Sequence, residues 1–200
     1  MLFYLASQSP RRSELLRQIA VLFEVITPQV DEQRLADESP PDYVYRLAAL
    51  KALRGLELVN DAEAVVLGAD TIVVIDGEIL GKPRDSEHGM DMLRKLSGRR
   101  HQVMSAVSLC SAIEQRTELS VTEVDFRPLS EQLIRHYWQF DEPRDKAGGY
   151  GIQGLGAAFV QNITGSYSGV VGLPIEKVVP LLEHFGIDYW QSMLGPSGPI

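Results

Sequence analysis

The segment AVVLGADTIVVIDGEIL, residues 64–80, indicates the architecture of this chain most directly. Residues 64–75 form an apolar run typical of a strand, and Asp76-Gly77 is a two-residue hairpin signal before a return strand at residues 78–80. The polar pair Asp70-Thr71 interrupts the apolar run. An unpaired buried carboxylate is unfavourable by several kcal/mol, so Asp70 is expected to have a metal, a cation or a hydrogen-bond cluster beside it. A structural carboxylate bound to backbone N–H groups at a strand bend is the alternative.

Hydrophobic periodicity on both sides of this segment predicts an α/β protein with a mixed sheet. Further strands are expected at residues 2–6, 23–27, 102–112, 117–127 and 157–162, of which 102–112 and 117–127 form a long antiparallel pair. Helices are expected at residues 10–19, 40–56, 86–96, 130–140 and 174–185, and the glycine-rich segment 148–156 is expected to be irregular. We predict one two-lobed domain over residues 1–186, followed by a loosely attached tail at 187–200.

Composition narrows the class of function. The 200 residues are 44% hydrophobic and 23% charged, with a net charge of −8, which argues against a nucleic-acid polymer as partner but not against a nucleotide. The single cysteine, Cys110, excludes a disulfide framework and fits a reducing cytoplasm. No apolar run approaches the ~20 residues of a membrane span, and the N-terminal residues lack the pattern of a signal peptide, so we expect neither feature.

The segment LASQSPRR, residues 5–12, predicts an anion site where the first strand meets the first helix. Ser9 is expected to cap the helix and Pro10 suits its first position. Arg11 and Arg12 are electrostatically disfavoured at a helix N-terminus unless an anion lies there, and their guanidinium groups match phosphate oxygens. The alternative is an ordinary capped helix with a basic first turn.

Other polar residues are candidates for the same site. Counting along the predicted hairpin places Asp70 opposite position 83, which brings Lys82 near it. Lys51 lies on an otherwise apolar helix, and Glu32 lies in an acidic loop. Gln153, between two apolar residues, is interpreted as a buried amide with a specific partner. For the lysines and for Glu32, a solvated surface charge is the alternative.

These motifs occur together in an order that resembles the Maf family of nucleoside triphosphate pyrophosphatases. The resemblance runs from about residue 2 to residue 185 and is carried by Ser7-x-Ser9-Pro10-Arg11-Arg12, Glu32, Lys51, Gly68-Ala69-Asp70-Thr71, Gly81-Lys82-Pro83 and Gly151-Ile152-Gln153-Gly154.

The resemblance implies an elongated mixed sheet flanked by helices, related to the inosine triphosphate pyrophosphatases, with two lobes and a central cleft. It also implies hydrolysis of a nucleoside triphosphate to the monophosphate and pyrophosphate, with a divalent cation, Mg²⁺ or Mn²⁺, as cofactor. A homodimer is the implied assembly. The alternatives are a purine-directed pyrophosphatase and a nucleotide-binding regulator of cell division.

Within the family, Asp70-Thr71 and Gln153 match the branch that resembles dTTP/UTP pyrophosphatases, and Arg12 and Thr71 are its other specificity positions. The branch acting on 7-methyl-GTP typically has Asp-Gln, and Glu in place of Gln153. A glutamine amide offers one donor and one acceptor, which match the imide edge of thymine or uracil. The same amide, flipped, matches cytosine, so neighbours must fix its orientation.

The resemblance assigns Asp70 as proton acceptor, although the sequence does not separate that role from metal binding. Glu32 is the additional carboxylate expected at the metal. The groups expected to hold the triphosphate and stabilise its transition state are Ser7, Ser9, Arg11, Arg12, Lys51 and Lys82, with the two lysines counted as catalytic.

Overall fold

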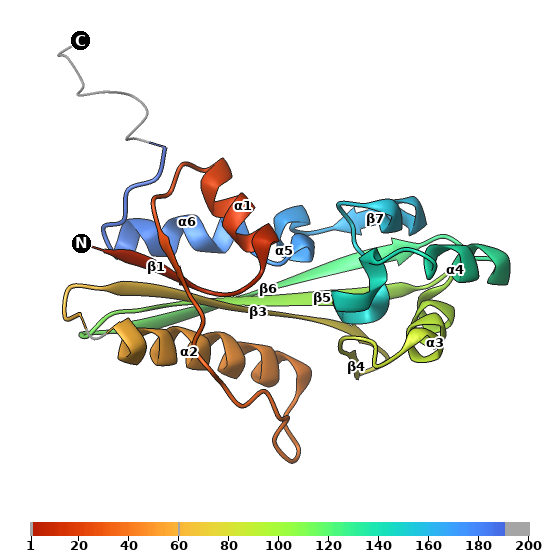
Figure 1. Ribbon diagram of the computed structural model, residues 1–200, viewed down its shortest axis with the longest axis horizontal. Helices are drawn as coiled ribbons and strands as arrows, with labels where there is room; N and C mark the ends of the chain where they lie inside the picture. Colours follow the sequence, from red (N-terminus) through yellow and green to blue (C-terminus); the bar gives the residue numbers. More distant parts are fainter. Residues whose placement is uncertain (1, 60, 191–200) are drawn as a thin grey trace, which may run out of the picture.

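The computed structural model describes residues 2–59 and 61–190, which form one mixed β-sheet of seven strands flanked by helices (Figure 1). The strands are β1 (Phe3–Ala6), β2 (Glu24–Ile26), β3 (Val65–Ile75), β4 (Glu78–Leu80), β5 (Arg100–Cys110), β6 (Gln115–Phe126) and β7 (Val160–Thr164). The α-helices are α1 (Pro10–Gln18), α2 (Pro40–Val59), α3 (Ser86–Leu96), α4 (Glu131–Tyr137), α5 (Tyr167–Val171) and α6 (Ile175–His184). Three 3-10 helices follow α4, namely η1 (Glu142–Asp145), η2 (Ala147–Gly149) and η3 (Leu155–Phe159). The predicted α/β class with a mixed, helix-flanked sheet is confirmed.

The strand order is β2-β1-β3-β5-β6-β7, with β4 added to β3. β1 is parallel to β2 and to β3, and the other pairs are antiparallel. The predicted hairpin at Asp76-Gly77 is confirmed, since Ile75 pairs with Glu78. The predicted long antiparallel pair is also confirmed by β5 and β6.

One edge of β3 is only partly paired. β5 pairs with residues 66–74 along one edge, whereas on the other edge β1 pairs with residues 65–68 and β4 with residues 73–75. Within the described chain, residues 69–72 therefore have no strand neighbour on that second edge. Asp70 and Thr71 lie in this gap, where helices and loops can reach the strand.

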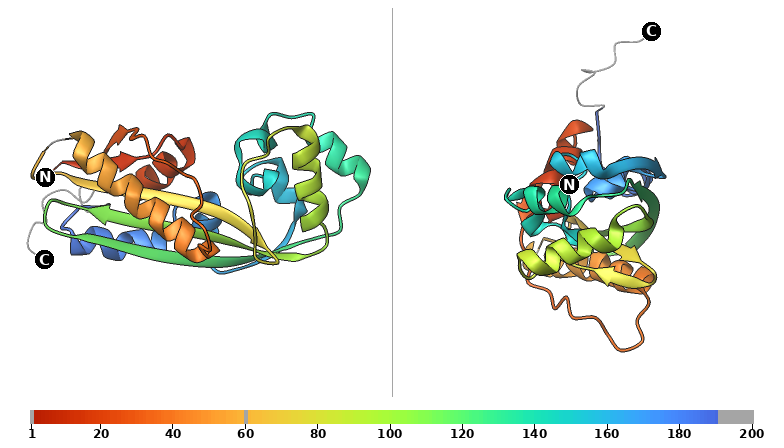
Figure 2. Two further views of the ribbon diagram at one scale, coloured as in Figure 1. Left: turned by 90° about the horizontal axis from the view of Figure 1, so that it is seen from below. Right: turned by 90° about the vertical axis from the view of Figure 1, so that its right-hand side faces the viewer.

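The helices form two groups, one at each end of the long strands. α2 packs on one face of the sheet against β3 and β5, while α5 and α6 pack on the other face against β5 and β6 (Figure 1). α3, α4 and the 3-10 segment, residues 142–159 with η1, η2 and η3, lie together at the opposite end of the molecule (Figure 2, left). The gap in β3 lies between these two groups.

Strand alternation sends the two residues of the polar pair to opposite faces. Ile72 packs with Val44 and Ala48 of α2, whereas Ala69 and Val73 belong to the large core cluster on the other face. By the same alternation, Asp70 faces α2 and Thr71 faces away from it.

Gly68 allows α2 to lie unusually close to β3. A Cβ atom at this position would lie 2.4 Å from the backbone oxygen of Ala48 and 2.4 Å from the backbone nitrogen of Ala52. Neither atom can move without displacing the helix, so this contact requires glycine. Because α2 lies so close, the side chain of Lys51 on this helix can reach Asp70 in the gap.

The expectations fail mainly after residue 150. The strand predicted at residues 157–162 begins only at Val160, because Leu155–Phe159 forms a 3-10 helix whose apolar composition resembles a strand. The short helix α5 was not predicted; the Ser166 hydroxyl caps it by accepting a hydrogen bond from the Gly169 N–H at 3.0 Å.

The segment beyond Gly186 begins as part of the domain. Ile187 is buried in the core, and the Trp190 N–H donates to the Ile19 carbonyl at 2.9 Å. A loosely attached tail from residue 187 is therefore wrong for residues 187–190, and residues 191–200 lie outside the described residues. In the described part of the chain, none of the helices has the length and apolar character needed to cross a membrane.

Candidate active site

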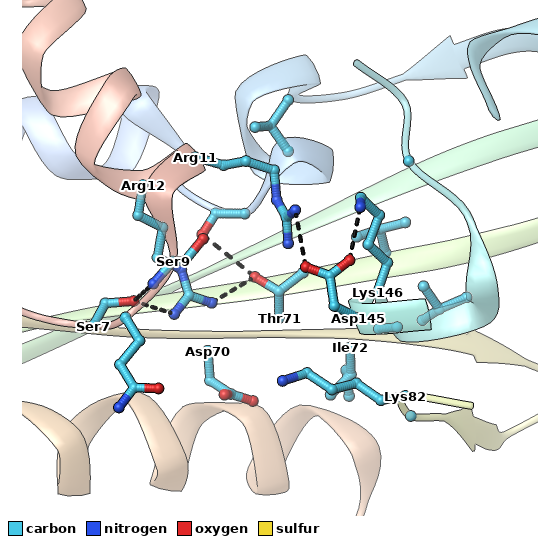
Figure 3. Close-up of a pocket in the computed structure, with 18 of the residues that line it drawn as sticks. Ser7, Ser9, Arg11, Arg12, Asp70, Thr71, Ile72, Lys82, Asp145 and Lys146 are labelled. Carbon is cyan, nitrogen blue, oxygen red and sulfur yellow. Dashed lines mark hydrogen bonds and ion pairs between the residues drawn. The ribbon is translucent and has the colours of Figure 1, made fainter. Parts of the chain in front are cut away.

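A cavity of about 1070 Å³ opens at the gap in β3 (Figure 3). Its wall comes from the β1–α1 turn, the loop after β2, α2, β3, the loop after β4, the 3-10 segment and α5. All ten residues singled out from the sequence line it: Ser7, Ser9, Arg11, Arg12, Glu32, Lys51, Asp70, Thr71, Lys82 and Gln153. The structure thus brings the whole predicted set to one place, while the role of each residue stays a prediction.

Arg12 is fixed by the protein itself. Its guanidinium donates to the backbone oxygens of Ala69 at 2.8 Å and Gly172 at 2.9 Å, and to the hydroxyls of Ser7 at 3.2 Å and Thr71 at 3.3 Å. The Ala69 carbonyl is available because the β3 edge is unpaired there. Burial lowers the pKa of Arg12, against the opposing charge of Asp70. Arg12 is therefore a rigid part of the wall with little donor capacity left.

Arg11 reaches across the cavity instead. Its Nη1 atom lies 3.7 Å from Oδ2 of Asp145, whose Oδ1 accepts a hydrogen bond from Lys146 at 2.8 Å (Figure 3). Arg11 lies on α1, which contacts α5 of the first group of helices, and Asp145 lies in η1 of the second group, so this ion pair spans the two walls. Because Asp145 is largely exposed, an anionic ligand can replace it beside Arg11 at small energetic cost.

The predicted cap of α1 is wrong in one respect. Ser9 occupies the N-cap position with Pro10 behind it, but within the described residues its hydroxyl accepts no capping hydrogen bond. The Ser7 hydroxyl instead accepts from the Ser9 N–H at 3.1 Å. The N-terminal end of α1 lines the cavity, so its first N–H groups remain available to an anion.

Lys51 joins two carboxylates from different segments. Its Nζ atom lies 2.7 Å from Oδ1 of Asp70 and 2.7 Å from Oε1 of Glu32. The side chains of Lys51 and Asp70 are only 14% and 12% exposed, so this pair is shielded from water. Burial acts to raise the pKa of Glu32, but hydrogen bonding to Lys51 and the charges of Lys51, Lys82 and Arg12 outweigh it, and the pKa is lowered. Glu32 is therefore an ionised carboxylate at neutral pH.

Lys82 reaches the site from the loop after the hairpin. β4 ends at Leu80, so no strand register extends to position 82. The side chain nevertheless lines the cavity, and its ammonium end points toward Asp70 (Figure 3).

Asp70 and Glu32 together are suited to a metal that a phosphate ligand helps to hold. No cluster of three or more His, Cys, Asp or Glu side chains with metal-binding geometry occurs in residues 2–59 and 61–190. Mg²⁺, however, is usually bound by one or two carboxylates together with substrate phosphates and water. The two carboxylates already converge on one cation, the Lys51 ammonium, so the donor set fits such an ion.

Gln153 is not the buried amide that the sequence predicted. Its side chain is exposed at the cavity wall and has no hydrogen-bond partner among the described residues. Thr71 is half-buried, and its hydroxyl lies 2.8 Å from that of Ser105 on β5 and accepts from Arg12. Thr71 thus belongs to the anchorage of Arg12, a contact that the sequence did not reveal.

Sequence reasoning also missed Glu142. Its carboxylate lines the cavity and accepts hydrogen bonds from the backbone of the glycine-rich segment that carries Gln153. An isolated glutamate before a proline carries no local signal of this role, because its partners lie 13 and 14 residues further along the chain.

The fold and the cavity define a class: an α/β protein whose pocket is lined by arginines, lysines and carboxylates, with a shielded carboxylate–lysine pair within it. The chain belongs to the Maf family, whose sequence model, described as "Maf-like protein", matches residues 2–185. The family resemblance predicted from the sequence is therefore confirmed.

Curated relatives cover most of the chain. A protein of Saccharophagus degradans is 52% identical over 192 residues, spanning 95% of this chain and 91% of its own length. Proteins of Salmonella typhimurium and Escherichia coli are 55% and 53% identical over 182 residues, each spanning 91% of this chain and 92% of its own length. All three relatives are named dTTP/UTP pyrophosphatase.

Proposed function

We propose that this chain is a nucleoside triphosphate pyrophosphatase that hydrolyses dTTP and UTP to the monophosphate and pyrophosphate. The observation that carries the proposal is the Lys51–Asp70 pair in the gap of β3, at the wall of a cavity that Arg11, Arg12 and Lys82 also line. Identity above 50% to proteins named dTTP/UTP pyrophosphatase supports the same substrates here.

In this proposal the triphosphate lies between the N-terminal end of α1 and Lys82. Arg11, the Ser9 hydroxyl and the first N–H groups of α1 bind phosphate oxygens from one side, and Lys82 binds them from the other. Arg12 keeps Thr71 and the β1–α1 turn in place. The base then lies toward Gln153, whose amide matches the donor and acceptor of a thymine or uracil imide.

Asp70 is the proton acceptor. Lys51 donates to Oδ1, and within the described residues Oδ2 accepts no hydrogen bond, so Oδ2 is available to a water molecule. As the water oxygen bonds to the α-phosphorus, its proton passes to Asp70. The bond from the α-phosphorus to the bridging oxygen breaks, and pyrophosphate leaves with the electron pair. Lys82 and Arg11 stabilise the charge that develops on it.

We further propose that Mg²⁺ or Mn²⁺ takes part, held by Asp70 and Glu32 with phosphate oxygens, where it offsets charge on the pyrophosphate leaving group. With the ion bound, Asp70 would be both one of its ligands and the proton acceptor, while Lys51 stays hydrogen-bonded to Oδ1. Glu32 is well suited to the ligand role because it is ionised and more than half exposed.

The first test is a substrate panel with the Asp70→Asn variant. Purified protein with Mg²⁺ or Mn²⁺ is incubated with dTTP, UTP, CTP, ITP, GTP and 7-methyl-GTP, and pyrophosphate and monophosphate are quantified. We expect release from dTTP and UTP, and a loss of roughly 10²-fold or more in turnover for Asp70→Asn.

Asp76→Asn, an exposed carboxylate in the same hairpin, is the matched control and keeps wild-type turnover. Preference for ITP or 7-methyl-GTP would overturn the substrate. Tight nucleotide binding without turnover would favour a regulator, and a folded Asp70→Asn protein with normal turnover would exclude Asp70 as the base.

A further inference from the structure

The carboxylate of Glu142 binds the backbone that follows Gln153. Its Oε2 accepts the Leu155 N–H at 2.8 Å, and its Oε1 accepts the Gly156 N–H at 3.0 Å. Both bonds are made by a charged acceptor, which makes them stronger than ordinary backbone hydrogen bonds. One side chain of η1 therefore fixes the start of η3.

Tyr137 extends this contact to the backbone that precedes Gln153. Its hydroxyl donates to Glu142 Oε1 at 2.8 Å and accepts the Gly151 N–H at 3.1 Å. The Gly154 N–H closes the turn by donating to the Gly151 carbonyl at 3.3 Å. Hydrogen bonds thus hold segment 151–156 on both sides of Gln153.

The glycines of this segment are what allow the carboxylate to lie so close. A Cβ atom at Gly154 would lie 2.1 Å from Oε2 of Glu142, and one at Gly151 would lie 3.0 Å from Oε1. Burial acts to raise the pKa of Glu142, but the N–H groups of Gly156 and Leu155 and the Tyr137 hydroxyl outweigh it and lower the pKa. Glu142 is therefore charged when it binds the segment.

Gln153 lacks such support of its own. Its side chain is exposed in the cavity wall, without a hydrogen bond to the described residues. The position from which its amide meets a ligand is thus set by the backbone of segment 151–156. An amide that reads uracil can also flip to read cytosine, so selectivity depends on how rigidly that backbone is held.

We propose that Glu142, with Tyr137, is a positioning residue for base selectivity: it fixes segment 151–156 so that Gln153 presents its amide to a pyrimidine imide in one orientation. The inference rests on the proposed function and adds to it a residue that acts on the base and not on the phosphates. It therefore predicts that Glu142 affects discrimination between UTP and CTP while leaving phosphate binding unchanged.

The test measures kcat and KM for UTP and CTP with wild type and Glu142→Gln. The glutamine keeps the shape of the side chain but turns an NH₂ group toward one of the two N–H donors. We expect the UTP-to-CTP ratio of kcat/KM to fall at least about tenfold, through a higher KM for UTP. The inhibition constant of inorganic tripolyphosphate, which has no base, stays within about twofold of wild type.

Asp141→Asn is the matched control, because Asp141 is adjacent, 94% exposed and, among the described residues, forms its ion pair with Arg144 and not with the segment. Tyr137→Phe, which removes only the hydroxyl, should lower the ratio in the same direction. If Glu142 acts through Gln153, then Glu142→Gln should not change the UTP-to-CTP ratio any further in a protein that already carries Gln153→Ala. A merely structural role of Glu142 would not produce that result.

An unchanged UTP-to-CTP ratio in Glu142→Gln, with wild-type turnover of UTP, would overturn this inference alone. An equal loss for UTP, CTP and tripolyphosphate would also overturn it, since the residue would then support the whole cavity. Failure of the wild type to hydrolyse any pyrimidine triphosphate would instead refute the proposed function.

Discussion

His101 shows how one buried residue supports the cavity from behind. Its Nε2 lies 2.8 Å from the hydroxyl of Tyr150, which lines the cavity, and its ring packs edge-on against Phe126. Burial lowers the pKa of His101 to about 4, against a small opposing effect of Asp125. The fold therefore holds this histidine neutral.

We expect His101 to make stability depend on pH in a defined window. In the unfolded chain the histidine binds a proton below about pH 6.5, whereas in the fold it does so only near pH 4. The unfolded state binds more protons in between, so stability present above pH 6.5 is lost as the pH falls toward 4. We expect the free energy of unfolding to fall by about 2 kcal/mol between pH 7 and pH 5, and denaturant unfolding at the two pH values measures this fall.

The matched variants are His101→Phe and His136→Gln. His101→Phe should show a smaller loss between these pH values, whatever its stability at pH 7. His136 is exposed on α4, so His136→Gln should follow the wild type. Identical pH dependence in wild type and His101→Phe would contradict the assignment.

At the scale of elements, the packing of α2 on β3 decides whether Lys51 reaches Asp70. Gly68 permits this packing because an added Cβ would meet the helix backbone at 2.4 Å. Lys51 is thus aligned by a backbone contact made at Ala52, the next residue, and at Ala48, about one turn earlier.

Gly68→Ala should therefore reduce both stability and activity. Moving α2 away from the strand is expected to cost about 1–3 kcal/mol of unfolding free energy and to separate Lys51 from Asp70, with a clear fall in kcat. Gly81→Ala serves as control for stability, since an added Cβ there has no atom within 4 Å. A fully stable and active Gly68→Ala protein would refute the close-packing argument.

At the scale of the whole molecule, the cavity is built from both groups of helices. The Arg11–Asp145 ion pair spans it, and residues from α1, α2, α5 and the 3-10 segment line it. A ligand that bridges these walls binds the folded state and not the unfolded chain.

We expect a non-hydrolysable α,β-imido analogue of UTP, with Mg²⁺, to raise the melting temperature. At about 100 times the dissociation constant the gain is about 2.7 kcal/mol, or roughly 5 to 11 °C for a chain of this size. Lys82→Ala should show a smaller shift at the same ligand concentration. Arg54 is exposed on α2, so Arg54→Ala should show the same shift as the wild type. If the melting temperature of the wild type does not change with any pyrimidine nucleotide, the proposed site is contradicted.

The sequence by itself determined the elements that depend on local patterns. The apolar run of β3 and the Asp76-Gly77 turn are encoded within a few residues. The order of the motifs also identified the Maf family, and every predicted site residue lines the same cavity.

Only the tertiary structure decided how those residues are held. The anchoring of Arg12 on Ala69 joins residues 57 positions apart, and its bond to Gly172 joins residues 160 positions apart. Glu142 binds a glycine-rich segment, and Gln153 is exposed where a buried amide was predicted. The unpaired edge of β3 results from where β1 and β4 end, which no pattern within β3 indicates. Local propensity specifies the elements because it acts over a few residues, whereas the site arises from contacts between segments far apart in the sequence.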